Sequence, residues 1–241
     1  MIEPRPEPVD AATSFVQQRF PQARCAFVGG AVLTEHRTPT SDLDVVVVLD
    51  EQDGCAPLRE TFEHEGWIVE AFVHTRDSLD RYWHQDAQRR SCALAAMCAR
   101  SVVVADPAAV AAEIQRAAAD RIAAGPPPAD DEQVETMRYL LTDLLDDMAG
   151  CDKEDELAYL AGAVMRAVAE LALVSGGRWG GTGKALARAV AEAEPDLAER
   201  LIDGHRHVVV YGDTSVLHRA AVDVLLRVGG PLLVGYRRQG E

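Results

Sequence analysis

Two aspartates at the start of an apolar run have a spacing that suits the binding of a divalent metal. Asp42 and Asp44 flank the first residue of the β-branched run Leu43–Leu49, and residues i and i+2 of a strand point to the same face. Two neighbouring carboxylates repel each other, so a site that keeps both ionised favours a divalent cation. A few carboxylate oxygens, completed by water and phosphate, are typical of a magnesium site.

A third carboxylate and a pair of glycines extend this pattern. Glu70 lies inside the apolar segment 67–74, where a strand rarely holds a charge without a partner. Gly29 and Gly30 end a short apolar segment at 25–28. Glycine lets the backbone approach a ligand closely, and turn amides can bind phosphate. The alternative for the two aspartates alone is a turn followed by a solvent-facing strand residue.

The glycine pair, the motif S-D-x-D beginning at Ser41 and the later strand carboxylate together resemble the polymerase-beta-like nucleotidyltransferase superfamily. The resemblance implies that Asp42, Asp44 and Glu70 bind two Mg²⁺ ions, with ATP or another nucleoside triphosphate as substrate. In that chemistry the two metals stabilise the attacking and leaving oxygens, and pyrophosphate departs. The resemblance also implies that Glu70 can deprotonate the acceptor hydroxyl.

The glycine turn departs from the family's pattern at the position of a serine that touches the triphosphate. That serine corresponds to Gly30 or to Ala31, depending on the direction of counting, so the hydroxyl is missing in both alignments. The loss of this contact costs about 1 kcal/mol of binding free energy, and Arg37 or a residue of the second half of the chain is expected to compensate. The nucleotide-binding residues expected around the turn are Gly29, Gly30, Arg37 and Ser41.

Hydrophobic periodicity predicts that the first half of the chain alternates between helices and strands. The predicted strands are 25–28, 43–49, 67–74 and 101–105, and the predicted helices are 9–20, 57–65, 78–100 and 107–123. Gly125 and the three prolines after it favour an extended linker, and the sequence beyond them has helical periodicity throughout. The expected fold class is α+β, with a nucleotidyltransferase domain at 1–124 whose mixed sheet is flanked by helices, and a helical, substrate-binding bundle at 129–241.

The second half of the chain is similar to antibiotic adenylyltransferases that have a helical C-terminal domain. The similarity is to the streptomycin and spectinomycin type and lies in residues 182–186, 194–197 and 211–212. It implies that Lys184 and Tyr211 contact the nucleotide. A lysine at a helix start after glycines can bind phosphate, and its alternative role is that of a solvated surface residue.

Acidic residues of the second half suggest an acceptor that carries positive charge. Tyr139, Asp143 and Asp147 recur at i+4 spacing and share one face of a predicted helix. If that face lines the substrate cleft, Asp143 and Asp147 can hold the ammonium groups of an aminoglycoside-type antibiotic. The alternative is an ordinary solvated helix face.

The composition excludes several other classes of protein. The net charge is −15, with 39 acidic and 24 basic residues, which argues against nucleic acid as a partner because a polyanion needs a basic face. No signal peptide or membrane-length apolar run is visible. The histidines and scattered cysteines lack zinc-ligand spacing. Unpaired cysteines are typical of a cytoplasmic protein.

The sequence therefore predicts an enzyme that transfers a nucleoside monophosphate, AMP from ATP, to a hydroxyl of a small molecule. The alternative is a catalytically weakened or regulatory protein of the same fold that binds a partner protein or modifies a protein. Release of pyrophosphate in the presence of an acceptor separates these two hypotheses.

Overall fold

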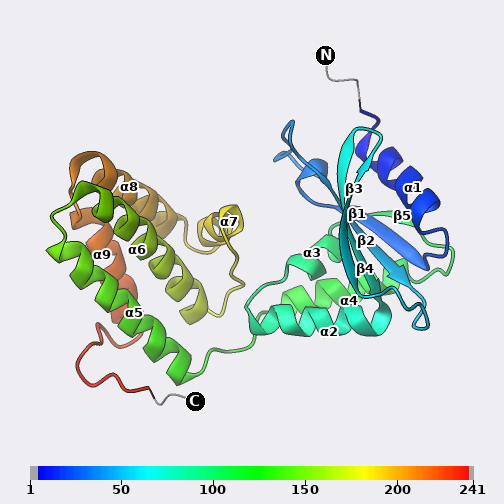
Figure 1. The fold of residues 1–241 in the computed structure, drawn as a ribbon. Helices are drawn as coiled ribbons and strands as arrows, with labels where there is room; N and C mark the ends of the chain where they lie inside the picture. The colour runs from blue at the N-terminus through cyan, green and yellow to red at the C-terminus, as the bar shows by residue number, and fades with distance from the viewer. Residues whose placement is uncertain (1–4, 239–241) are drawn as a thin grey trace. The chain divides into compact units, whose positions relative to one another are not determined.

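A computed structural model describes residues 5–238, and the chain divides between Ala124 and Gly125 into two compact units. The N-terminal unit, blue to green in Figure 1, contains a five-stranded sheet with helices on both faces. The C-terminal unit, green to red, is helical throughout its regular structure. The predicted fold class, α+β with a mixed sheet followed by helices, is confirmed.

The sheet of the N-terminal unit has the strand order β3-β4-β2-β1-β5. Strands β2 and β4 pair in parallel, and the other neighbours pair antiparallel. The elements of this unit are α1 (Pro8–Arg19), β1 (Cys25–Gly29), a 3₁₀ turn (Ala31–Leu33), β2 (Leu43–Leu49), β3 (Leu58–His64), β4 (Trp67–Thr75), α2 (Arg76–Gln88), α3 (Ala93–Ala99), β5 (Val102–Ala105) and α4 (Ala111–Ala124).

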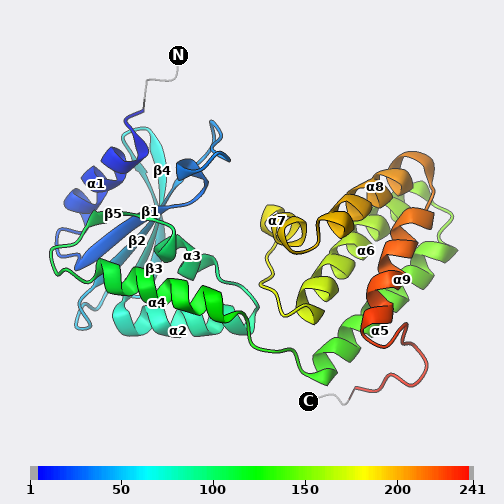
Figure 2. The same ribbon diagram turned by 180° about the vertical axis from the view of Figure 1, so that it is seen from behind.

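Helices cover the two faces of this sheet unequally, as the two opposite views in Figures 1 and 2 show. Helix α1 packs on one face, where Val45 and Val47 of β2 are buried. Helices α2, α3 and α4 pack on the other face, where Val46 and Val48 are buried. Because β2 is buried on both faces beyond Asp44, its sequence from Val45 to Leu49 is a continuous apolar run and does not alternate with polar residues.

Two segments differ from the sequence-based prediction. Residues 57–65 were expected to form a helix, but they form the edge strand β3, whose partner is β4. Glu65 and Gly66 have positive φ angles and make the tight turn of this hairpin. The helix expected over 78–100 is interrupted between α2 and α3, where Arg90 has a φ of 54°.

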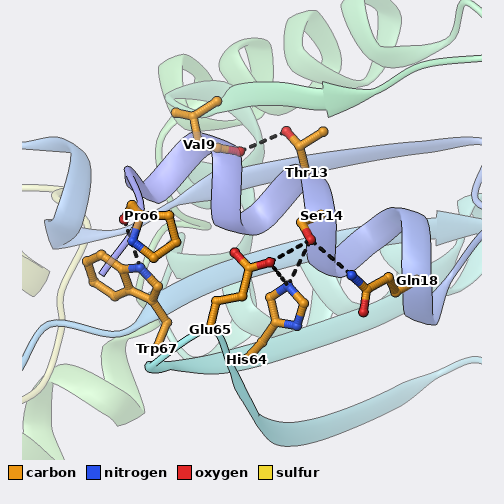
Figure 3. Close-up of polar contacts among 8 residues, drawn as sticks. All are labelled: Pro6, Val9, Thr13, Ser14, Gln18, His64, Glu65 and Trp67. Carbon is orange, nitrogen blue, oxygen red and sulfur yellow. Dashed lines mark hydrogen bonds and ion pairs between the residues drawn. The ribbon is translucent and has the colours of Figure 1, made fainter. Parts of the chain in front are cut away.

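Polar contacts attach the turn of the β3–β4 hairpin to helix α1 (Figure 3). The Ser14 hydroxyl donates to Glu65 Oε1 at 3.0 Å, and His64 Nε2 lies 3.2 Å from the same hydroxyl. The indole N–H of the buried Trp67 donates to the carbonyl oxygen of Pro6 at 3.1 Å. These contacts fix the end of the hairpin from which β4 runs toward Glu70.

The C-terminal unit contains five helices within its described residues. They are α5 (Asp131–Gly150), α6 (Glu154–Ser175), α7 (Lys184–Ala193), α8 (Pro195–Tyr211) and α9 (Ser215–Arg227). Its buried apolar side chains form one core to which all five helices contribute. Helix α6 is long and apolar enough to cross a membrane, yet half of its most apolar window is buried inside this unit. Such burial is typical of a core helix.

Candidate functional site

Strand pairing places a glycine and two carboxylates side by side across the middle of the sheet. Gly29 of β1 pairs with Asp44 of β2, and Asp44 pairs with Glu70 of β4. Asp42 lies two residues before Asp44, at the entry to β2. Because side chains alternate along a strand, Asp44 projects to the same face as Val46, the face that α2–α4 cover farther along the strand.

The three carboxylates converge on one point. One oxygen of each of Asp42, Asp44 and Glu70 lies within 4.8 Å of the others, and all three residues are half-buried. Carboxylate oxygens at such separations can share one hard cation or bridge two, with water and phosphate filling the remaining positions. The donor set therefore fits Mg²⁺, and the sheet brings together the three residues that the sequence singled out.

Gly30 allows the chain to turn directly beside Asp44. Its φ of 84° is one that residues with a side chain rarely adopt, and a Cβ added at this position would overlap the Asp44 carboxylate. At Gly29 an added Cβ would lie 3.2 Å from the carbonyl oxygen of Met97. A serine at position 30 would therefore collide with the Asp44 carboxylate, so the turn could not carry a serine hydroxyl there without rearrangement.

Arg59 belongs to the site, and the sequence analysis missed it. Its Nη2 donates to Glu70 Oε2 at 2.8 Å, and its guanidinium carbon lies 4.8 Å from the centre of the Phe72 ring. Arg59 comes from the edge strand β3, on the face that also carries Glu70 and Phe72. The contact arises from the pairing of β3 with β4, whereas residues 57–65 were expected to be helical.

A cavity of about 310 Å³ adjoins this ion pair, between β3, β4 and helices α2 and α3. Arg59 and Phe72 line it near Glu70, and Tyr82, His74 and Asp86 line it farther away. Burial lowers the pKa of His74 to about 4 and raises the pKa of Asp86. The cavity therefore has an apolar and aromatic wall, an uncharged histidine at neutral pH and a guanidinium at the end beside Glu70.

The loop between the glycine turn and β2 holds the other residues that were expected to bind nucleotide. The backbone N–H of Thr38 donates to Ser41 Oγ at 2.9 Å, which orders the loop just before Asp42. The guanidinium carbon of Arg37 lies 5.4 Å from the centre of the Trp67 ring, and the Arg37 side chain is exposed. The Ser41 hydroxyl therefore helps to order this loop, and the nucleotide contacts expected of Ser41 and Arg37 stay predictions.

The remaining candidate residues belong to the C-terminal unit. Lys184 is exposed and begins α7 after Gly183, whose φ is 52°. Tyr211 ends α8 and is 73% exposed. Asp143 and Asp147 are exposed on α5. All four side chains are therefore accessible to a ligand, and the roles expected for them stay predictions.

Comparison with known proteins finds similarity among solved structures but none at the level of sequence families. No protein-family model matches the sequence, and no curated protein matches it. Among solved structures, the chain is similar to a nucleotidyltransferase-like protein from Exiguobacterium sibiricum, with a TM-score of 0.47 and 11% sequence identity. The similarity covers 91% of this chain and 74% of that chain. At this level of similarity it carries no argument about activity.

Proposed function

We propose that the protein is a magnesium-dependent nucleotidyltransferase that transfers a nucleoside monophosphate, AMP from ATP, to a hydroxyl of a small molecule. The observation that carries the proposal is the convergence of Asp42, Asp44 and Glu70 beside a glycine turn whose conformation excludes side chains. Carboxylates held this close repel one another when they are ionised, and a bound divalent cation would relieve that repulsion.

Asp42, Asp44 and Glu70 would hold two Mg²⁺ ions. When bound, these ions would neutralise charge on the triphosphate and on the attacking and leaving oxygens. The backbone at Gly29 and Gly30 would receive the triphosphate, because nothing projects from the turn toward Asp44.

The order of the strands supports a particular orientation of the substrates in the proposed reaction. Gly29 and Glu70 flank Asp44 on opposite sides, and in phosphoryl transfer the attacking and leaving oxygens are roughly in line with the phosphorus. If pyrophosphate leaves on the side of the glycine turn, the acceptor hydroxyl approaches on the side of Glu70. The Glu70 carboxylate can then accept the hydroxyl proton, with Arg59 and the adjoining cavity on the same side.

We assign the acceptor to the class of small, cationic molecules with hydroxyl groups, of which aminoglycoside-type antibiotics are an example. The proposal draws on the net charge of −15 and on the exposed Asp143 and Asp147, since an acidic surface attracts cations and repels nucleic acid. Lys184 and Tyr211 would contact the nucleotide. The reaction would take place in the cytoplasm, without a nucleic-acid partner or a membrane.

Release of pyrophosphate tests the proposed reaction. The protein is incubated with Mg²⁺, ATP and a panel of aminoglycosides, and pyrophosphate is measured with and without each acceptor. We expect release that depends on both Mg²⁺ and an acceptor and that disappears in Asp44→Asn. Binding of MgATP without release for any acceptor would contradict the proposed transfer and would favour a regulatory protein of this fold.

A further inference from the structure

The ion pair between Arg59 and Glu70 involves a carboxylate that the proposed metal site also needs. Arg59 Nη2 lies 2.8 Å from Glu70 Oε2, and an oxygen of Glu70 is one of the three that converge with those of Asp42 and Asp44. A positive guanidinium in contact with the Glu70 carboxylate repels a divalent cation that approaches the same carboxylate. Arg59 therefore competes with the metal for Glu70.

The geometry of Arg59 makes this ion pair easy to exchange. The side chain of Arg59 is 63% exposed and that of Glu70 is 25% exposed, and exposed ion pairs contribute little to stability. Arg59 lies on the edge strand of the sheet, beside the cavity of about 310 Å³. Its guanidinium carbon lies 4.8 Å from the centre of the Phe72 ring, and because the Arg59 side chain is mostly exposed, a change of partner requires no rearrangement of the buried core.

A guanidinium released from Glu70 would need a new anion. The anion that arrives with the metal is the triphosphate, and the planar guanidinium fork matches the geometry of phosphate oxygens. Arg59 and the glycine turn lie on opposite sides of the carboxylates, since β3 and β1 flank the β4–β2 pair. A phosphate chain bound at the carboxylates would thus meet backbone amides on one side and Arg59 on the other.

We infer that Arg59 is an exchangeable phosphate-binding residue, which pairs with Glu70 in the absence of metal and with a phosphate group of the nucleoside triphosphate in the metal–nucleotide complex. The inference rests on the proposed function. It predicts that Arg59 has opposite effects on two ligands: it weakens binding of the metal alone and strengthens binding of the metal–nucleotide complex. A purely structural ion pair in the hairpin would not produce such opposite effects.

Calorimetric titration of Arg59→Gln with Mn²⁺ alone and with MgATP tests the inference. We expect Mn²⁺ to bind about fivefold more tightly than to the wild type, because an exposed competing charge is worth up to about 1 kcal/mol. We expect MgATP to bind about tenfold more weakly, because a charge-assisted contact with phosphate is lost. Arg59→Lys keeps the positive charge but loses the planar guanidinium that donates two hydrogen bonds to a phosphate group. Its MgATP affinity should therefore lie between those of Arg59→Gln and the wild type.

Arg24→Gln is the matched control. Arg24 makes a 3.1 Å exposed ion pair with Asp50 at the opposite end of β1 and β2, so this variant should bind both ligands as the wild type does. Unchanged Mn²⁺ affinity in Arg59→Gln would overturn the competition, and unchanged or tighter MgATP binding would overturn the phosphate contact. If the wild type binds MgATP and Asp44→Asn binds it equally well, the proposed function fails together with the inference. If the predicted affinity changes are absent in Arg59→Gln but Asp44→Asn loses MgATP binding, the inference about Arg59 is wrong and the proposed function is not contradicted.

Discussion

At the scale of single residues, the site depends on Gly30, a position that has no room for a side chain, as well as on the carboxylates. Gly30 has no side chain at the point where one would meet the Asp44 carboxylate, and its φ of 84° suits glycine. The conformation of this one residue lets β1 end beside β2 and keeps backbone amides close to the carboxylates.

Gly30→Ala should disturb both the fold and the site. We expect a loss of about 1–3 kcal/mol in the free energy of unfolding, because alanine is strained at this φ, together with weaker MgATP binding as Asp44 is displaced. Chemical denaturation and calorimetric titration measure the two effects. Gly54→Ala is the control, since an added Cβ there meets nothing within 4 Å. Wild-type MgATP affinity in Gly30→Ala would contradict this account of the turn.

The carboxylates were predictable from the sequence, and their cationic neighbour was not. The i, i+2 spacing of Asp42 and Asp44 in a strand places both on one face whatever the strand pairs with. Arg59 reaches Glu70 only through the pairing of β3 with β4. Such a contact between neighbouring strands depends on the register of the sheet, which local sequence patterns do not specify.

At the scale of elements, the helices of the C-terminal unit pack closely at a glycine. An alanine Cβ at Gly204 in α8 would lie 2.8 Å from the backbone nitrogen and 2.9 Å from the Cα of Leu217 in α9. Helix α9 would have to move away, because backbone atoms cannot give way as a flexible side chain can.

Gly204→Ala should therefore destabilise the protein by about 1–3 kcal/mol, as overpacked substitutions do. Gly162→Ala in α6 is the matched control, since its added Cβ meets nothing within 4 Å. It should stabilise the protein by about 0.5–1 kcal/mol through helix propensity. Thermal unfolding of both variants measures the two shifts, and a Gly204→Ala protein as stable as Gly162→Ala would contradict the packing.

The start of helix α2 carries a pH-dependent element. His74 is 4% exposed, lies next to the capping box of Thr75 and Ser78, and its Nδ1 is 3.2 Å from Ser78 Oγ. Burial lowers the pKa of His74 from 6.5 to about 4. Above pH 6.5 the ring is neutral in both the folded and the unfolded chain. Between pH 6.5 and 4 only the unfolded chain takes up the proton, so acidification favours unfolding.

The free energy of unfolding should therefore fall by roughly 2–3 kcal/mol between pH 7 and 4.5 on account of His74 alone. Urea denaturation at several pH values, for the wild type and for His74→Asn, isolates this contribution. The variant should lose less stability on acidification than the wild type does. Equal pH dependence in the two proteins would show that His74 is not buried as an uncharged ring.

The elements whose sequence has one clear hydrophobic pattern were predicted correctly. The elements whose secondary structure depends on tertiary contacts were not. The apolar run of β2 could only be a buried strand, and the structure confirms it. Strand β3, with the sequence LRETFEH, consists of residues that tolerate a helix and is largely exposed. It becomes a strand because β4 offers an unpaired edge and because Glu65 and Gly66 adopt the turn. The interruption between α2 and α3 at Arg90 was likewise missed, because no glycine or proline in the sequence indicates it.

At the scale of the whole molecule, the chain consists of two units with separate cores. Each cluster of buried apolar residues lies entirely within one unit, and the two units divide between Ala124 and Gly125. The three carboxylates and Arg59 all belong to the N-terminal unit, whereas Lys184 and Tyr211 belong to the C-terminal one. The metal site is proposed for the first unit, and the nucleotide contacts expected of Lys184 and Tyr211 stay predictions.

Substitution of Lys184 and Tyr211 tests the nucleotide contacts expected of these two residues. Lys184→Ala and Tyr211→Ala should each weaken MgATP binding severalfold, as expected for the loss of one contact with the nucleotide, and should leave the binding of Mn²⁺ alone unchanged. Lys153→Ala is the control, because Lys153 pairs with Glu156 in an exposed contact at 2.7 Å. Wild-type MgATP affinity in both variants would remove these residues from the proposed site.

The most direct test of the central claim is calorimetric titration of MgATP into the wild type, Asp42→Asn and Asp44→Asn. Both substitutions keep the size of the side chain and remove its charge. Asp50→Asn, at the far end of β2, is the control. We predict that the wild type and Asp50→Asn bind MgATP equally and that the other two variants show no saturable binding. MgATP affinity that is unchanged in both Asp42→Asn and Asp44→Asn would contradict the assignment of these carboxylates as the metal and nucleotide site.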